Sequence, residues 1–211
     1  MLESVKSILY RSSLMIKTLM MVPLLISIPG STFFGTYNKM ESIMESIEVP
    51  IPVIEFKEPT WKLPDGTFAE QYVLEQLQEK TKITDRNALA TILGNIKSES
   101  NFHANICEGG ARIPYDSCHS GGYGLIQWTS EGRYMGLGKF ASKYGCDPST
   151  LQCQTRYMIN ENIFQNVLKE FEGSGRTVSQ YMVPAYYWLG WGIKGYREQY
   201  AYEYVKKLVL S

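Results

Sequence analysis

A glutamate at the end of an amphipathic segment is the residue best placed for acid–base chemistry in this sequence. Glu99 continues an apolar series whose spacing predicts the buried face of a helix. The series consists of Leu89, Ile92, Leu93 and Ile96. Burial penalises a charged carboxylate, and the C-terminal end of a helix carries partial negative charge. Both effects favour a carboxyl group that keeps its proton near neutral pH, as a general acid in glycoside cleavage requires.

Downstream of Glu99, residues 121–129 have the composition of a sugar-binding wall. Their sequence is GGYGLIQWT, in which the glycines let the backbone approach a ligand closely. The amide of Gln127 can hold an N-acetyl group or a water molecule. Tyr123 and Trp128 can stack on a pyranose face, although Trp128 fits a core position beneath the segment equally well. The segment predicts a short hairpin around residues 121–126, with side chains that are suited to contact a sugar.

Two carboxylates between these segments are candidates for a second acid–base group. A retaining glycosidase places this group about 5–5.5 Å from the acid, whereas an inverting enzyme leaves a wider gap for water. Asp116 is the first choice and Glu108 the second. The alternative is that both only solvate a glycine-rich loop, in which case a positioned water completes the reaction.

The four cysteines lie in one stretch, and two pairs close short loops. We expect local disulfides Cys107–Cys118 and Cys146–Cys153, although four cysteines allow three connectivities. Inert buried thiols are the next alternative, and zinc ligation is the least favoured because the cysteine spacing does not suit it. Disulfides would place the activity of the protein outside a reducing cytosol.

Late in the chain, an aromatic cluster can supply the far wall of the same cleft. It consists of Tyr186, Tyr187, Trp188 and Trp191. Trp188 is assigned to substrate binding, although packing against the Glu99 helix explains the cluster about as well.

Two histidines offer a rival enzyme class, a Cys/His amidase or endopeptidase. His103 follows the Glu99 segment closely, and His119 adjoins Cys118. Such an enzyme needs a thiol that a histidine can deprotonate. We favour this class less, because neighbours in sequence need not bring their side chains together.

Apolar periodicity predicts an α+β, mostly helical domain with a small hairpin patch. Residues 84–85 (Thr-Asp) supply the N-cap of the Glu99 helix, whose pattern ends at residues 101–102. Another helix is expected at 68–80, after a capping turn at residues 65–66. Later helices are expected at 134–144, 151–171, 178–189 and 196–208.

Residues 1–48 differ from the rest of the chain. Basic residues precede an apolar run at 18–28, as in a signal peptide. The run is too short and too interrupted by Pro23 for a membrane-spanning helix, and a poor cleavage site follows it. We favour an apolar anchor that docks into partner proteins over a signal peptide, with a retained membrane anchor third. Residues 49–65 contain four prolines and are expected to form an extended linker, followed by the catalytic domain at 66–211.

The charge balance argues against a nucleic-acid partner. The chain carries 21 basic and 21 acidic side chains, for a net charge of zero. Nucleic-acid-binding proteins normally carry a basic excess.

Two motifs together resemble the phage tail lysozyme family. They are GNIKSESNF at 94–102 and GGYGLIQWT at 121–129. The pair also resembles, more loosely, goose-type lysozymes and lytic transglycosylases, whose signature is a Glu-Ser pair closing a helix and a later Gly-Leu-Met-Gln element. Here the element has isoleucine in place of methionine. The resemblance extends over about residues 67–210, and further matches are Arg133, Gln154, Tyr157 and Glu161.

The resemblance implies a role for each matching position. Glu99 corresponds to the catalytic acid, and Gly124, Gln127 and Trp128 to the hairpin that lines the cleft. Ser100 and Thr129 extend these motifs and are assigned to substrate binding with them. Lytic transglycosylases can work with one glutamate, so the lack of a second acid would not exclude catalysis.

The resemblance also implies a biological setting. The substrate is bacterial peptidoglycan, with no metal and no cofactor. We expect a lysozyme of a phage virion, in the tail or baseplate, that opens the host wall during entry and acts in the periplasm or cell wall. Residues 1–48 would bind other tail proteins. The alternatives are an endolysin held by a signal-anchor until host lysis, and a structural tail protein whose lysozyme-like domain only binds glycan.

Overall fold

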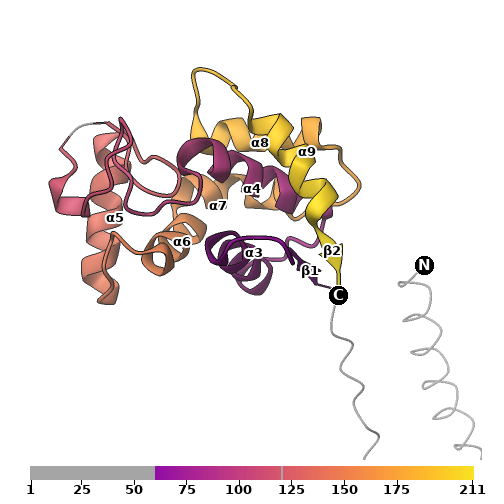
Figure 1. Cartoon of the computed structure of the whole chain (residues 1–211), viewed down its shortest axis with the longest axis horizontal. Coiled ribbons are helices and arrows are strands. Elements are labelled where there is room, and N and C mark those ends of the chain that lie inside the picture. Colours follow the sequence, from indigo (N-terminus) through magenta and orange to yellow (C-terminus); the bar gives the residue numbers. More distant parts are fainter. Residues whose placement is uncertain (1–59, 120) are drawn as a thin grey trace, which may run out of the picture. The chain divides into compact units, whose positions relative to one another are not determined.

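Helix α4 (Arg86–Ser100) forms the centre of the fold, with α3 (Phe68–Lys80) on one side (Figure 1). Helices α8 (Val178–Leu189) and α9 (Arg197–Lys207) lie on the other side. The computed structural model describes residues 60–119 and 121–211. Seven α-helices and one small antiparallel sheet lie in this part of the chain, which confirms a mostly helical α+β fold. No helix of the described part has the length and apolar character needed to cross a bilayer. The anchor expected at 1–48 lies outside the described residues, as does most of the expected linker.

The start and end of α4 are set by local chemistry. The Asp85 carboxylate accepts hydrogen bonds from the backbone N–H groups of Asn87 and Ala88, at 2.8 and 3.1 Å, as expected for an N-cap. At the other end, Asn101 and Phe102 have positive φ values of 49° and 62°. Left-handed residues cannot continue a helix, so α4 ends directly after Glu99 and Ser100.

Helix α3 begins at a capping box one residue later than the expected turn. The Thr67 hydroxyl accepts from the Glu70 N–H, and the Glu70 carboxylate accepts from the Thr67 N–H at 2.7 Å. Residues 65–66 form only the preceding turn, in which the Gly66 N–H donates to the Leu63 carbonyl. Glu70 also accepts a hydrogen bond from the hydroxyl of Tyr204 on α9, so this carboxylate ties α3 to α9.

The Glu70–Tyr204 hydrogen bond predicts a stability that depends on pH. Burial opposes ionisation of Glu70, but the hydrogen bonds from Tyr204 and Thr67 outweigh it, so its pKa lies below the ordinary value of 4.5. A carboxyl group with a lowered folded-state pKa stabilises the protein above its unfolded pKa, and this stability is lost as pH falls through the folded-state pKa.

Tyr204→Phe is therefore expected to lower the free energy of unfolding by about 1.5 kcal/mol at pH 7 and by clearly less at pH 3. Urea denaturation at both pH values measures this difference. The matched control is Tyr187→Phe, at a tyrosine that is 69% exposed. An equal loss at both pH values for Tyr204→Phe would contradict the prediction.

Helices α8 (Val178–Leu189) and α9 (Arg197–Lys207) cover α4, and a glycine sets how closely α9 approaches. A Cβ atom at Gly94 would lie 2.4 Å from the backbone nitrogen of Ala201 and 2.9 Å from the carbonyl oxygen of Arg197. Only glycine therefore allows the two backbones this contact.

Gly94→Ala is expected to destabilise the protein by about 1–3 kcal/mol, because the extra methyl group must push α9 away. Gly132→Ala is the matched control, since Gly132 also lies in a helix, α5, and a Cβ atom there meets nothing within 4 Å. The control should be neutral or stabilising, by up to about 1 kcal/mol. Thermal unfolding of the two variants measures the contrast, and equal midpoints would contradict the close contact.

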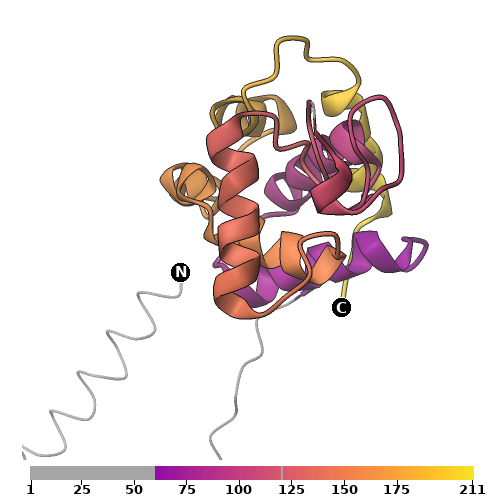
Figure 2. The same ribbon diagram turned by 90° about the vertical axis from the view of Figure 1, so that its left-hand side faces the viewer.

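The remaining helices are α5 (Glu131–Tyr144), α6 (Leu151–Asn160) and α7 (Asn162–Phe171). Figure 2 shows α5 in front of the other helices. A single helix was expected at 151–171, but Glu161 has extended dihedral angles, with ψ at 133°, and divides it into α6 and α7. This break turns the Glu161 side chain toward the core, where it is 7% exposed.

The sheet pairs the beginning and the end of the described chain. Strand β1 (Trp61–Lys62) runs antiparallel to β2 (Val209–Leu210). The Trp61 indole N–H donates to the Thr84 carbonyl at 2.8 Å, and Leu63 is 2% exposed. Residues 60–65 were expected to belong to a linker, but in the structure they pack onto the helical domain, because their apolar side chains find a buried place on it.

Candidate active site

The glycine-rich loop (residues 104–129, without Ser120, which is not described) lies against the C-terminal end of α4. It is held by isolated bridges that pair Ile106 with Arg112, Cys107 with Tyr123, and Tyr123 with Trp128. A short hairpin was expected at 121–126. The structure has a turn there instead, with Gly121 and Gly124 at φ values of 75° and 73°. These left-handed residues favour glycine and interrupt regular strand pairing.

Both expected disulfides are present. Cys107 is bonded to Cys118, and Cys146 to Cys153. The first bond closes the glycine-rich loop, and the second joins the end of α5 to α6. The bonds engage the sulfur atoms that a thiolate nucleophile or a cysteine zinc site would need, which removes the sequence support for a Cys118–His119 peptidase.

Polar side chains fasten the glycine-rich loop to the helices. The buried hydroxyl of Ser100 donates to the Leu125 carbonyl at 2.7 Å. The buried amide of Gln154 accepts from the Leu125 N–H at 2.7 Å and donates to the carbonyls of Ala104 and Pro148. Gly124 lies directly against this amide, since a Cβ atom there would be 2.4 Å from the Gln154 oxygen. Ser100 and Gly124 thus hold the loop in place rather than facing a ligand.

A buried ion pair supports the other end of the loop. Arg133 contacts both oxygens of the Glu161 carboxylate at 2.7 Å, in a bidentate arrangement. The Trp128 indole N–H donates to the same carboxylate at 3.3 Å. Glu161 therefore fixes both the ring of Trp128 and the start of α5.

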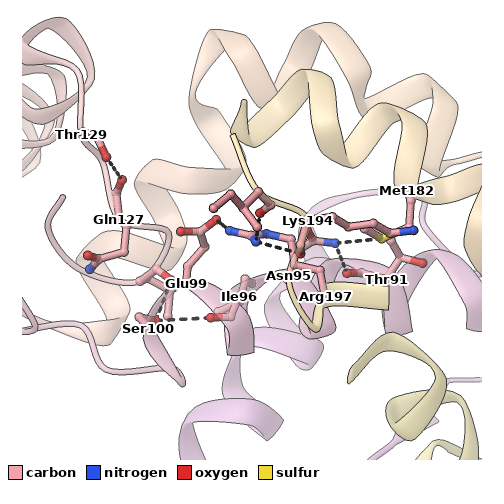
Figure 3. A network of polar contacts seen from close by, with 12 residues as sticks. Thr91, Asn95, Ile96, Glu99, Ser100, Gln127, Thr129, Met182, Lys194 and Arg197 are labelled. Atoms are coloured by element: carbon pink, nitrogen blue, oxygen red, sulfur yellow. Dashed lines mark hydrogen bonds and ion pairs between the residues drawn. The ribbon is translucent and has the colours of Figure 1, made fainter. Parts of the chain in front are cut away.

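Glu99 lies where α4, α9 and the glycine-rich loop meet, and it forms an ion pair with Arg197 (Figure 3). The side chains of Glu99 and Arg197 are 15% and 10% exposed. The guanidinium contacts Oε1 of Glu99, while Oε2 accepts no hydrogen bond from any described residue. The burial agrees with the sequence expectation. The ion pair with Arg197 was not expected.

Gln127 and Thr129 are the predicted binding residues that the structure leaves accessible. Gln127 is partly buried with a φ of 50°, and its amide nitrogen donates to the carbonyls of Ile106 and Gly124 at 3.3 and 3.1 Å. The exposed hydroxyl of Thr129 donates to the Gln127 carbonyl. In Figure 3, Gln127 lies on the opposite side of Glu99 from Arg197. These side chains can offer hydrogen bonds to a polar ligand beside Glu99.

Three predicted binding residues are in the core. Tyr123, Trp128 and Trp188 are at most 1% exposed. Trp188 packs edge-on against Phe164, at a ring-centroid distance of 5.0 Å. Because these rings have no exposed face, the expected stacking on sugar does not fit this structure. The three rings are instead part of the hydrophobic core.

The two candidate second carboxylates occupy different places. Asp116 is exposed and lines an open hollow of about 890 Å³ between the glycine-rich loop and α5, together with His119, Thr129 and Lys139. Glu99 does not line this hollow. Glu108 is exposed on the glycine-rich loop and accepts a hydrogen bond from the Gly122 N–H at 3.0 Å.

His103 follows α4 and is uncharged near neutral pH. Burial, and next the positive charge of Arg112, lower its pKa below the ordinary value of 6.5. It therefore adds no charge beside the α4 terminus under neutral conditions.

Sequence reasoning missed Arg197, the closest charged partner of Glu99. The two residues are 98 positions apart, and no motif connects them. The close fit of α9 on α4 at Gly94 brings the two residues together. This fit can be seen only after the helices have packed, so nothing in the sequence signals the pair.

Comparison with known proteins agrees with this arrangement. The family model described as phage tail lysozyme matches residues 69–208. The chain therefore belongs to the phage tail lysozyme family, which confirms the resemblance. Membership of this family assigns the chain a lysozyme-like activity on peptidoglycan. No curated protein matches the sequence.

Proposed function

We propose that Glu99 is the general acid of a peptidoglycan glycosidase. The observation that carries this proposal is the location of its carboxyl group at the junction of α4, α9 and the glycine-rich loop, with Oε2 unengaged by the described residues. In the proposed reaction, the proton on Oε2 passes to the glycosidic oxygen as the bond from that oxygen to the sugar carbon breaks. The bonding electrons remain on the oxygen, and the ring develops positive charge.

Gln127 and Thr129 are proposed to hold the sugar beside Glu99. Both offer accessible polar atoms. Ser100, Tyr123, Gly124 and Trp128 are proposed to act indirectly, by fixing the loop that carries these groups. Trp188 is proposed to act only as a core residue of α8, packed against Phe164. This assignment narrows the binding residues expected from sequence to those that a sugar can reach.

The second step of the reaction separates a hydrolase from a lytic transglycosylase. In a hydrolase, Asp116, Glu108 or a positioned water completes the reaction, and the product has a reducing end. In a transglycosylase, the sugar's own hydroxyl attacks and an anhydro sugar forms. Of the two carboxylates, Asp116 lines the hollow of about 890 Å³, whereas Glu108 is engaged with the loop backbone.

Mass analysis of fragments released from purified peptidoglycan by the full chain tests the proposed reaction. We expect cleaved glycan strands with intact peptide stems. If the wild type releases fragments with reducing ends and Asp116→Asn does not, a hydrolase in which Asp116 completes the reaction is supported. Fragments with anhydro ends would support the transglycosylase. Cleaved peptide stems with intact glycan would overturn the glycosidase.

For the biological setting, we propose a component of the phage tail or baseplate that opens the host wall during entry. Family membership and the apolar composition of residues 1–48 support this proposal. Residues 1–48 are proposed to bind other tail proteins, residues 49–59 to link them to the folded domain. Mass spectrometry of purified phage particles should find the chain with the tail proteins. Detection only in infected cells, free of particles, would favour the endolysin.

A further inference from the structure

Arg197 is held in the active site from three directions. One nitrogen donates to the carbonyls of Ile193 and Lys194, each at 3.0 Å. The guanidinium carbon lies 5.0 Å from the centroid of the Trp191 ring. A second nitrogen contacts Oε1 of Glu99. This guanidinium is nearly buried and cannot move without breaking these contacts, so its charge is fixed beside the carboxyl group.

Among the described residues, Arg197 is the charged group that contacts Glu99. Helix α8 contains no charged residue. Several charged groups on the neighbouring elements are engaged elsewhere: Glu70 accepts a hydrogen bond from Tyr204, Lys97 pairs with Glu203, and Lys194 pairs with Glu198. On the glycine-rich loop, Glu108 is bound to a backbone N–H and Arg112 to Asn105, while His103 is uncharged near neutral pH. Arg197 is therefore the charge in direct contact with Glu99.

We propose that Arg197 is a positioning residue that makes Oε2 of Glu99 the proton-donating oxygen and stabilises the carboxylate left after the proton is given up. This proposal rests on Glu99 being the acid. By engaging Oε1, the guanidinium leaves Oε2 to face the substrate. A fixed positive charge stabilises the negative charge that develops on Glu99 as the proton leaves.

This role predicts a loss of rate without a loss of glycan binding when the full chain acts on purified peptidoglycan. Arg197→Met is expected to lower the rate at saturating peptidoglycan on the order of 100-fold. The peptidoglycan concentration that gives half of that rate should change little, because the guanidinium contacts Glu99 rather than the proposed sugar-binding residues. Arg197→Lys keeps the positive charge but not the contacts to the two carbonyls, so it should recover part of the lost rate.

The variants separate this role from a purely structural one. If Arg197→Met does not fold, Arg197→Gln removes the same charge while keeping donors for the two carbonyls, with the same expected loss of rate. A folded, uncharged variant that keeps the wild-type rate, or that loses rate only because it binds peptidoglycan more weakly, would overturn the proposal. Glu99→Gln tests the underlying function separately: if it keeps wild-type activity, the acid assignment fails whatever Arg197 does.

Discussion

Replacing Glu161 by alanine should lower the free energy of unfolding by about 3–5 kcal/mol, a large share of the stability of a typical domain. The Glu161 side chain is 6% exposed and its partner Arg133 is 15% exposed. Removing the carboxylate leaves a guanidinium in low dielectric without a counter-charge. It also leaves the Trp128 indole N–H without its acceptor. Both losses act in the same direction.

An exposed ion pair in the same protein provides the matched control. Glu170 pairs with Arg176, and their side chains are 54% and 40% exposed. Glu170→Ala should change stability by no more than about 1 kcal/mol, because water already screens this pair. Urea denaturation measures the free energy of unfolding of both variants. The dependence of this free energy on urea concentration should be the same as in the wild type. Equal effects for the two pairs would contradict the structural importance of Glu161.

The Glu161→Ala variant also connects the core to the active site. Trp128 belongs to the same glycine-rich loop as Gln127, and Glu161 holds its ring in the core. We therefore expect the surviving folded protein to bind glycan more weakly. This loss is indirect and should appear together with the loss of stability.

The helix that carries Glu99 was predictable because its information is local. The N-cap at Asp85, the apolar spacing and the stop at Asn101 all lie within one short segment. The disulfides were also predictable, since each closes a short loop. The division of the expected 151–171 helix at Glu161 was not predictable, because the apolar pattern continues through it. The partner of Glu161 in the ion pair, Arg133, is distant in the sequence.

The composition of the glycine-rich loop was informative, but the roles of its residues were not. Aromatic side chains can stack on sugars or fill a core, and sequence does not distinguish these uses. Tyr123, Trp128 and Trp188 proved to be buried. Likewise, Arg197 and the β1–β2 pairing depend on contacts between segments far apart in sequence, which periodicity cannot reveal.

Glu99→Gln is the second change with a large expected effect. The amide keeps the size of the side chain and can still accept a hydrogen bond from Arg197, but it has no proton to give to the glycosidic oxygen. General acid catalysis contributes about 10²–10⁴-fold to the rate, so the variant should lose activity by about this factor. Glu75→Gln, at an exposed position on α3, is the matched control and should keep the wild-type rate.

The most direct test of Glu99 as the acid is the initial rate at which the full-length wild type, Glu99→Gln and Glu75→Gln clear a suspension of purified peptidoglycan. Unfolding midpoints of the three proteins are compared in parallel to establish that each is folded. The account predicts clearing by the wild type and the Glu75 variant, and a rate at least about 100-fold lower for Glu99→Gln. A folded Glu99→Gln that clears the suspension as fast as the wild type would contradict it.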